Sequence, residues 1–405
     1  MTENTLGDQL RSWRWYSLVI GVLGTIGCII GAVVQWQQFL RSYLYSYFFV
    51  LGLAIGGMAL VMIHQLIGGA WGLLVRRTAE AQMKTLPLMA LLFLPIAFGI
   101  WQIYPWAGIH LENSQSNYQF WRNYLIPSWF YIRAVAYFVI WIVLMVLMAV
   151  WSRTQDKSPS VRNFWRSYKM SGFGLLLLGI TTHFAAMDWM MSLQRGFTST
   201  IFGALIFCHW VLSAYAFTVI IFCWLLARPE FDSVLSSKAM NDLGSLLFTI
   251  LTLWAYLTWF QFMLIWMADL PHGNVWYLIR WRGTWGWIAS FLLIFQFVIP
   301  FLLLLLRVIK QSRLRLGLVA ALVFVGQLLF MYYYVVPVFG LSGWAYHWTD
   351  FLTPLAVGGI WFAFVLWILT LRPLLPVYDL NYEQALLLRE IDLEEMAREE
   401  ALTHE

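Results

Sequence analysis

Charged residues and cysteines are scarce in this sequence of 405 residues. Only 11% of the residues are Asp, Glu, Lys or Arg, whereas 61% are hydrophobic and 18% are aromatic. No soluble core needs that balance, which is typical of a polytopic membrane protein. The 25 Trp residues agree with this class, because Trp gathers at membrane interfaces. Nothing in the composition indicates a nucleic-acid partner.

The three cysteines, Cys28, Cys208 and Cys223, lie inside apolar stretches and form no CxxC or CxxCH pattern. The sequence therefore offers no covalent site for haem c, no thiolate site for an iron–sulfur cluster and no disulfide framework. A di-haem cytochrome b is also disfavoured, because each His-bearing helix carries only one deep His. We expect this chain to bind no metal and no redox cofactor.

Ten apolar stretches are long enough to span a membrane. They lie at about 16–35, 46–75, 86–104, 127–151, 170–193, 198–227, 242–269, 284–309, 314–337 and 350–372. The predicted fold class is therefore an all-α polytopic membrane protein with ten transmembrane helices. We expect residues 1–377 to form the transmembrane domain and residues 378–405, which are rich in Asp and Glu, to form an acidic tail.

The distribution of basic residues predicts an orientation. Most of the 25 Lys and Arg residues fall in the N-terminus, in the even-numbered loops and after the last span. By the positive-inside rule, the N- and C-termini are cytoplasmic. The loops on the other side are rich in Trp, Tyr, Pro and Gly, which suits either a partner surface or interfacial anchoring in lipid.

Two ionisable residues fall at the same depth on consecutive spans. Arg133 lies roughly 9 Å from the outer start of the fourth span, and Asp188 lies roughly 8 Å from the outer end of the fifth. This match predicts an ion pair between Arg133 and Asp188. Such a pair is either a structural clamp or a means of tuning a functional acid.

Three histidines inside the spans predict a ladder of titratable groups. His183 and His209 fall near a common level, about 15 Å from the outer ends, and His64 lies about 27 Å from its outer end. With Asp188 they form a hypothetical proton relay, because neutral imidazole both accepts and donates a proton. The gaps of roughly 6 to 12 Å between levels require ordered water or hydroxyl groups. Alternatively, each His only donates an interhelical hydrogen bond.

Two further functional classes stay open. One is a stand-alone, proton-coupled secondary transporter, although we find no pair of Gly- or Pro-broken helices in corresponding halves, which is the usual sign of a midplane substrate site. The other is a purely structural subunit whose polar groups only tie helices together.

Three stretches resemble a known family. They are "YLIPSWFYIRAVAYFVIW" (124–141), "AAMDWMMSLQRGFTSTIFGALIF" (185–207) and "VWYLIRWRGTWGWIASFLLIFQFVIPFLLLLLRVIK" (275–310). They resemble the membrane subunits of bacterial alternative complex III, which are similar to the membrane subunit of polysulfide reductase. The likeness runs through most of the chain. It implies two four-helix bundles, made of helices 2 to 5 and helices 6 to 9, with flanking helices 1 and 10.

The resemblance also implies a function and partners. The chain would be a subunit of a quinol:electron-acceptor oxidoreductase in the bacterial inner (cytoplasmic) membrane, serving respiratory or photosynthetic electron transport. Menaquinol or another quinol would be the substrate of the complex, and cytochrome c or a blue copper protein the acceptor. The implied partners are a paralogous membrane subunit with the quinol site, a multihaem cytochrome c subunit and an iron–sulfur subunit. The shorter membrane subunit of the family has no redox centre, and a proton-conducting role is proposed for both.

Arg133 falls on the family's "IR" position and Asp188 on its "DW" position. The sequence departs from the family pattern just after "SL". Where the family has an acid, Pro and His, this chain has Gln194, Arg195 and Gly196. It therefore lacks the acid and the His of an outer proton exit at this point, and Arg195 would repel protons there.

Overall fold

The computed structural model describes residues 6–107, 123–157, 161–225, 237–340 and 347–371. All regular elements in these ranges are helices, and ten spans within them are long and apolar enough to cross a membrane. The chain is therefore an all-α multi-pass membrane protein, as predicted. The expected tail at 378–405 and its boundary at residue 377 lie outside the described residues.

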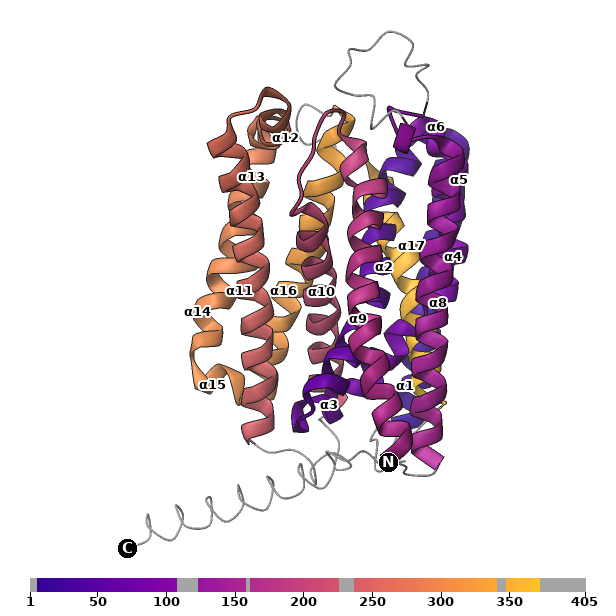
Figure 1. Cartoon of the computed structure of the whole chain (residues 1–405), viewed down its shortest axis with the longest axis vertical. Helices are drawn as coiled ribbons and strands as arrows, with labels where there is room; N and C mark the ends of the chain where they lie inside the picture. The colour runs from indigo at the N-terminus through magenta and orange to yellow at the C-terminus, as the bar shows by residue number, and fades with distance from the viewer. Residues whose placement is uncertain (1–5, 108–122, 158–160, 226–236, 341–346, 372–405) are drawn as a thin grey trace, which may run out of the picture.

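The helices follow the predicted spans closely, except where a span is divided into shorter helices (Figure 1). In the first half they are α1 (Leu6–Val34), α2 (Trp36–Ile67), α3 (Ala70–Met83), α4 (Leu86–Leu92), α5 (Leu94–Phe98), α6 (Ile100–Ile103), α8 (Pro127–Lys157) and α9 (Val161–Trp189). In the second half they are η2 (Met191–Leu193), α10 (Phe202–Leu225), α11 (Ser237–Ala268), α12 (Pro271–Trp281), α13 (Thr284–Phe291), η4 (Leu292–Val298), α14 (Ile299–Leu305), α15 (Arg307–Lys310), α16 (Arg313–Val335), η5 (Val336–Phe339) and α17 (Trp348–Leu369).

The helices form two bundles with a flanking pair. In the first, bundle 2–5, α2 contacts α3, α4 and α9, and α8 packs on α4 and α9. In the second, bundle 6–9, α10 contacts α11 and α16, while η4 and α14 pack on α16 and α11. The first and last spans, α1 and α17, lie along each other beside the bundles (Figure 1). This is the arrangement that the resemblance implies.

The two bundles meet where α2 packs on α10. A Cβ atom added at Gly52 would lie 2.1 Å from the Trp210 ring, and one at Gly56 would lie 2.3 Å from the Trp210 carbonyl oxygen. Two glycines four residues apart share one face of a helix, so α2 presents a flat surface that lets the two backbones approach closely. Both helices are almost wholly buried as a result.

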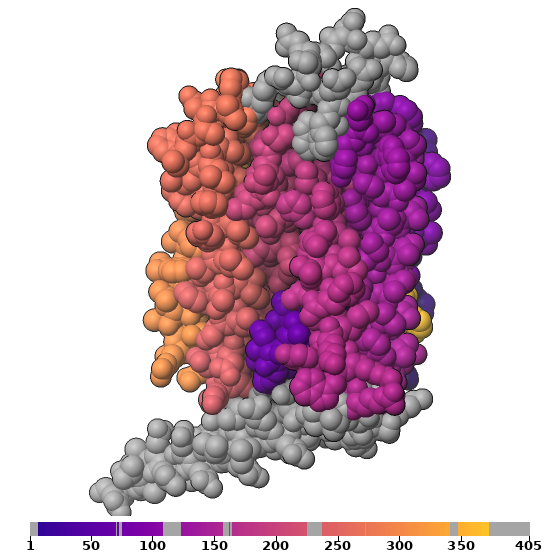
Figure 2. Space-filling view, viewed as in Figure 1, coloured from indigo at the N-terminus to yellow at the C-terminus, as the bar shows by residue number. Residues whose placement is uncertain are grey.

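The segment expected as a loop between the second and third spans is instead a helix. Gly68 and Gly69, with φ of 73° and 97°, turn the chain from α2 into α3, and this conformation favours glycine. α3 returns into bundle 2–5 and reaches the surface between α9 and α11 (Figure 2). The third span therefore covers Val75–Phe98, and not 86–104 as expected. A search for apolar runs does not find the first part of this span, because α3 contains charged residues.

Two spans are interrupted, one in each bundle. In the third, Pro87 and Pro95 open α4 and α5. In the eighth, η4 is a π-helical segment that joins α13 to α14, and Pro300 follows it. Proline has no N–H to donate to the helix, which explains breaks at these points. The interrupted span is the second of four in bundle 2–5 and the third of four in bundle 6–9. The two interruptions therefore do not hold corresponding positions.

The ends of the molecule differ. α6 and α12 lie at one end, which we call the α12 end, and α3 and α15 lie toward the opposite end, which we call the α3 end (Figure 1). α1 begins, and α17 finishes, at the α3 end. With ten spans both described termini lie on the same side, as the sequence predicts. In the predicted orientation, the α3 end faces the cytoplasm.

Substitution of Gly56 by Ala should destabilise the protein, because the new methyl group would overlap a backbone oxygen that cannot move aside. We expect a loss of about 1–3 kcal/mol, as for other overpacked cores. Gly179→Ala on α9 is the matched control, since its Cβ would meet nothing within 4 Å. The control should gain up to about 1 kcal/mol from helix propensity. Thermal unfolding in detergent, followed by Trp fluorescence, measures both, and equal midpoints would contradict the tight contact.

Candidate functional site

Arg133 on α8 and Asp188 on α9 form a bidentate ion pair toward the α12 end. The Arg133 Nε lies 2.7 Å from Asp188 Oδ2, and its Nη2 lies 3.1 Å from Oδ1. The Asp188 side chain is 1% exposed and that of Arg133 is 17% exposed. The structure thus brings together the two residues whose matching depths predict a pair. Bidentate geometry is the strongest form of this interaction.

Two tyrosines complete this group, which we call the Asp188 cluster. The Tyr137 hydroxyl, one turn from Arg133 on α8, donates to Asp188 Oδ2 at 2.9 Å. Arg133 Nη1 donates to the Tyr124 carbonyl oxygen at 3.0 Å, and its guanidinium lies 3.9 Å from the centre of the Tyr124 ring. The carboxylate therefore accepts three hydrogen bonds from α8.

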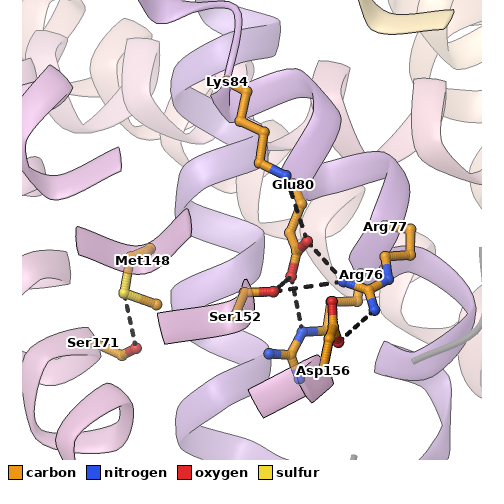
Figure 3. Close-up of polar contacts among 8 residues, drawn as sticks. All are labelled: Arg76, Arg77, Glu80, Lys84, Met148, Ser152, Asp156 and Ser171. Carbon is orange, nitrogen blue, oxygen red and sulfur yellow. Dashed lines mark hydrogen bonds and ion pairs between the residues drawn. The ribbon is translucent and has the colours of Figure 1, made fainter. Parts of the chain in front are cut away.

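A second charged group lies in the same bundle toward the α3 end, and Figure 3 shows it. Glu80 on α3, with a side chain that is 1% exposed, contacts three cations, two on its own helix and one directly after it. These are Arg76 (3.1 Å), Arg77 (3.1 Å) and Lys84 (3.8 Å). The Ser152 hydroxyl on α8 donates to Glu80 Oε1 at 2.7 Å. We call these residues, with Asp156, the Glu80 cluster.

Asp156 links the Glu80 cluster to α8 a second time. Arg77 Nη2 lies 2.7 Å from Asp156 Oδ1, so this arginine bridges two acids on different helices (Figure 3). The apolar pattern of the sequence predicts a loop at these charges and therefore does not predict the cluster. The spacing of Arg76, Arg77, Glu80 and Lys84 by three or four residues is the signal that predicts pairing on one helix.

Hydroxyl groups lie between the two clusters in bundle 2–5. The Trp141 indole N–H on α8 donates to the Thr181 hydroxyl on α9 at 2.9 Å. The next residue, Thr182, is fully buried, and its hydroxyl has no hydrogen-bond partner among the described residues. Bundle 2–5 thus carries a buried carboxylate toward each end and polar side chains between them.

His183 and His209 do not face each other. A Cβ atom added at Gly203 would lie 2.3 Å from His183 Nδ1, so the His183 ring lies against the first turn of α10. His209 is six residues further along α10, which is about 9 Å deeper and about 240° around the helix. Its ring packs on Phe330 of α16, 5.1 Å away, and is fully buried.

The prediction that His183 and His209 share a level is therefore wrong. It assumes that the sixth span begins at 198, near the membrane surface. Instead, the chain continues beyond η2, and α10 begins only at Phe202, beside His183 on α9. The end of α9 and the start of α10 are thus offset along the membrane normal. No periodicity in the sequence reports such an offset.

His64 lies at the turn between α2 and α3, toward the α3 end as predicted. Its Nε2 lies 3.3 Å from the Gly69 carbonyl oxygen, and its ring packs edge-on to Trp71 at 5.3 Å. A Cβ atom at Gly72 would overlap the ring at 1.6 Å. His64, His183 and His209 therefore contact different neighbours, and the geometry forms no continuous relay through the three rings.

Arg280 on α12 is a fully buried cation that the sequence analysis does not select. It donates hydrogen bonds to the carbonyl oxygens of Trp276, Tyr333 and Tyr334. Its guanidinium also lies 3.3 Å from the centre of the Trp276 ring. Burial lowers the pKa of Arg280 to about 10. The residue ties α12 to the end of α16 and so closes bundle 6–9 at the α12 end.

Within the described ranges, no group of three or more His, Cys, Asp or Glu side chains is arranged to hold a metal ion. The three cysteines are buried and are not joined to one another. Comparison of the chain with protein-family models finds no match, and comparison with curated proteins finds none either.

Glu80→Gln should destabilise the membrane domain, because three cations would then surround a neutral amide. Removal of one partner from a buried ion pair costs about 3–5 kcal/mol, and we expect a loss near the lower value. Asp8→Asn is the matched control, since Asp8 and Arg11 form an exposed pair at 4.0 Å and exposed pairs contribute little. Thermal midpoints in detergent measure both, and equal small shifts would contradict the buried role of Glu80.

The Arg133–Asp188 pair should show strong coupling in a double-mutant cycle. Arg133→Met or Asp188→Leu alone leaves one buried charge without its partner and should cost about 3–5 kcal/mol. The double variant leaves no such charge and should unfold at a higher temperature than either single variant. Additive losses in the thermal midpoints would mean that the two residues are not energetically paired.

Proposed function

We propose that the chain is an integral membrane subunit of a quinol:electron-acceptor oxidoreductase similar to bacterial alternative complex III. In this proposal it has no redox centre of its own. It anchors the complex in the bacterial inner membrane, with its termini in the cytoplasm, and provides a path for proton translocation. The acceptor of the complex is cytochrome c or a blue copper protein.

The bundle arrangement supports the proposal. The resemblance implies bundles made of helices 2 to 5 and 6 to 9 with two flanking helices, and the fold has this arrangement. Two of the stretches that carry the resemblance, 124–141 and 185–207, supply every residue of the Asp188 cluster. The likeness therefore concerns packed, interacting residues as well as apolar sequence.

The observation that carries the proton path is the pair of buried carboxylates in one bundle. Asp188 and Glu80 lie toward opposite ends of bundle 2–5, and both are held by arginine. Ionisable groups inside a membrane domain are costly and mark ion or proton pathways in many pumps and transporters. Thr181 and Thr182 on α9 lie between the two acids, and Trp141 on α8 donates to the Thr181 hydroxyl. Protons would pass between these groups through ordered water.

Each predicted relay residue has a restricted role in this proposal. Asp188 and Glu80 are the acids of the path, and Arg133 tunes Asp188. His64 lies where the path would meet the α3 end, and His183 lies beside the first turn of α10. His209 lies in bundle 6–9 and would be reached only through further polar groups.

The partners and cofactors follow from the resemblance. A paralogous membrane subunit would bind menaquinol or another quinol, and multihaem cytochrome c and iron–sulfur subunits would carry the electrons to the acceptor. Membrane lipid would cover the remaining apolar faces of the spans. Each redox cofactor would belong to a partner subunit and none to this chain.

A purely structural subunit is the second candidate, and the same ion pair favours it. A bidentate Arg133–Asp188 pair with added Tyr137 has the geometry of a clamp between α8 and α9. A stand-alone secondary transporter is the third, and the interrupted third and eighth spans favour it, since broken helices often line substrate sites.

Purification from the native membrane through a C-terminal tag distinguishes the hypothesis of a complex subunit from that of a stand-alone transporter. We expect c-type haem and quinol:acceptor activity to co-purify with the tagged chain. A colourless protein without partners would contradict the complex and favour the transporter.

The Asp188→Asn variant distinguishes a role of Asp188 in a proton path from a purely structural role as a clamp between helices. If the proton path operates, the purified complex should keep its subunits and haem content but translocate several-fold fewer protons per quinol oxidised. Proteoliposomes with a pH-sensitive dye measure this ratio. Loss of subunits from the variant complex would instead favour the purely structural role.

A further inference from the structure

Each of the four spans of bundle 6–9 carries one fully buried side chain with an amide or imidazole group. They are His209 on α10, Gln261 on α11, Gln296 on η4 and Gln327 on α16, each with 0% exposure. We call these four residues the polar core. An apolar residue would be expected at each position in a bundle whose other faces meet lipid. Four independent exceptions in one bundle therefore require a common explanation.

None of the polar atoms of these four side chains has a hydrogen-bond partner among the described residues. The unpaired atoms are both ring nitrogens of His209 and the amide nitrogen and oxygen of each glutamine. Buried polar groups are nearly always paired, since leaving one unpaired costs about 1–3 kcal/mol. The bundle would not keep eight such atoms unless a ligand satisfied them.

Three of the four side chains lie near one another, and Gln261 lies beside Tyr277 of α12. The Gln327 side chain interacts with the His209 ring, although the two do not reach hydrogen-bond geometry. A Cβ atom at Gly326, next to Gln327, would lie 2.8 Å from the Cβ of Gln296, so η4 packs directly against this part of α16. The Gln261 side chain likewise interacts with the Tyr277 hydroxyl on α12 without reaching hydrogen-bond geometry. This hydroxyl also has no hydrogen-bond partner in the described part of the chain.

All four side chains lie inside the bundle, away from the helix ends. His209 and Gln261 lie roughly 10 Å from the ends of their own helices nearest α12, Gln327 roughly 12 Å and Gln296 roughly 18 Å, and α10 itself begins beside His183, within the membrane domain. Tyr277 on α12 lies toward the α12 end. The polar core belongs to other helices than those of the Asp188 cluster, which α8 and α9 supply.

The backbone is also irregular beside the polar core. Gln296 lies within the π-helical segment η4, which begins at Leu292 and ends at Val298. Pro300 cannot donate the α-helical hydrogen bond to the Gln296 carbonyl oxygen, four residues before it. π-helical turns are frequent at functional sites. The distortion therefore lies where a polar residue, Gln296, packs against α16.

The chemistry of the unpaired atoms identifies the ligand class. Each glutamine presents one donor group and one acceptor, and a neutral His presents one of each. A cation would leave the donors unsatisfied, and an anion would leave the acceptors unsatisfied. Water both donates and accepts, and a buried water molecule makes about three hydrogen bonds to groups of this kind. Several linked water molecules therefore match the set.

We propose that the polar core binds a chain of ordered water molecules, which extends from His209 toward the α12 end beside Tyr277. This inference does not rest on the proposed function, because it depends only on side chains of bundle 6–9. The chain of water gives the imidazole of His209 a hydrogen-bonded connection toward the α12 end. It is separate from the path in bundle 2–5.

A density map of the purified protein in lipid nanodiscs, at a resolution that shows water, tests the proposal directly. We expect several separate peaks within about 3.2 Å of the amides and the His209 ring. A polar core in which the amides and the ring bond only to one another would overturn the proposal. Continuous density for a lipid or quinone headgroup between the amides would overturn it as well.

Thermal unfolding of Gln→Met variants gives a second test, in which the sign of the shift decides. If water satisfies the amides, Gln261→Met and Gln327→Met should each lower the midpoint by about 2 °C or more, since a hydrogen-bonded site is lost. If the polar core is dry, the same changes remove an unsatisfied group and should raise the midpoint.

Gln82→Met calibrates this second test. The Gln82 amide donates to the Thr218 hydroxyl at 2.6 Å, so its replacement should lower the midpoint whether or not bundle 6–9 holds water. A fall for Gln82→Met together with a rise for both core variants would overturn the proposal. A fall for all three variants would support it, and neither outcome depends on partner subunits or on catalytic activity.

Discussion

The close contact between α2 and α10 is the constraint on which the rest of the structure depends. Gly52 and Gly56 let the Trp210 backbone approach α2, and the two bundles are joined along this line. Lipid supplies no hydrophobic drive for helices to associate, so van der Waals contact at such small residues must supply it. Because both helices are buried on all sides, every other span of the bundles is positioned relative to this pair.

The two bundles use different chemistry to hold polar groups in the membrane domain. Bundle 2–5 uses full charges, and each buried carboxylate is compensated by arginine and by hydroxyl groups from a neighbouring helix. Bundle 6–9 uses neutral amides and one imidazole, which need no counter-ion but do need hydrogen-bond partners. Charge compensation fixes a geometry, whereas neutral groups bridged by water can exchange partners. The two halves are thus suited to different degrees of rearrangement.

Hydropathy predicts the class and the number of spans because lipid demands apolar length, and helical rise predicts the Arg133–Asp188 pair because consecutive spans are antiparallel. Hydropathy fails for a helix that is buried in the bundle but rich in charged residues. α3 is packed in the bundle although it carries Arg77 and Glu80, so a search for apolar runs assigns it to a loop. The level of His209 depends on where α10 begins, and only packing against α9 decides that. Isolated glutamines such as Gln296 carry no pattern that separates a buried amide from an interfacial one.

The charges on α3 also bear on the order in which the protein is assembled during synthesis. The third span, Val75–Phe98, carries four charged residues in its first half, and a charged side chain opposes insertion by up to about 2.5–3.5 kcal/mol, the value at the centre of a spanning helix. Its partners Ser152 and Asp156 lie on α8, which the ribosome makes some 70 residues later. We therefore expect nascent α3 to remain at the membrane surface until α8 has inserted. The Glu80 cluster could then form, and bundle 2–5 could finish folding, only after α8, the third span of this bundle, has inserted.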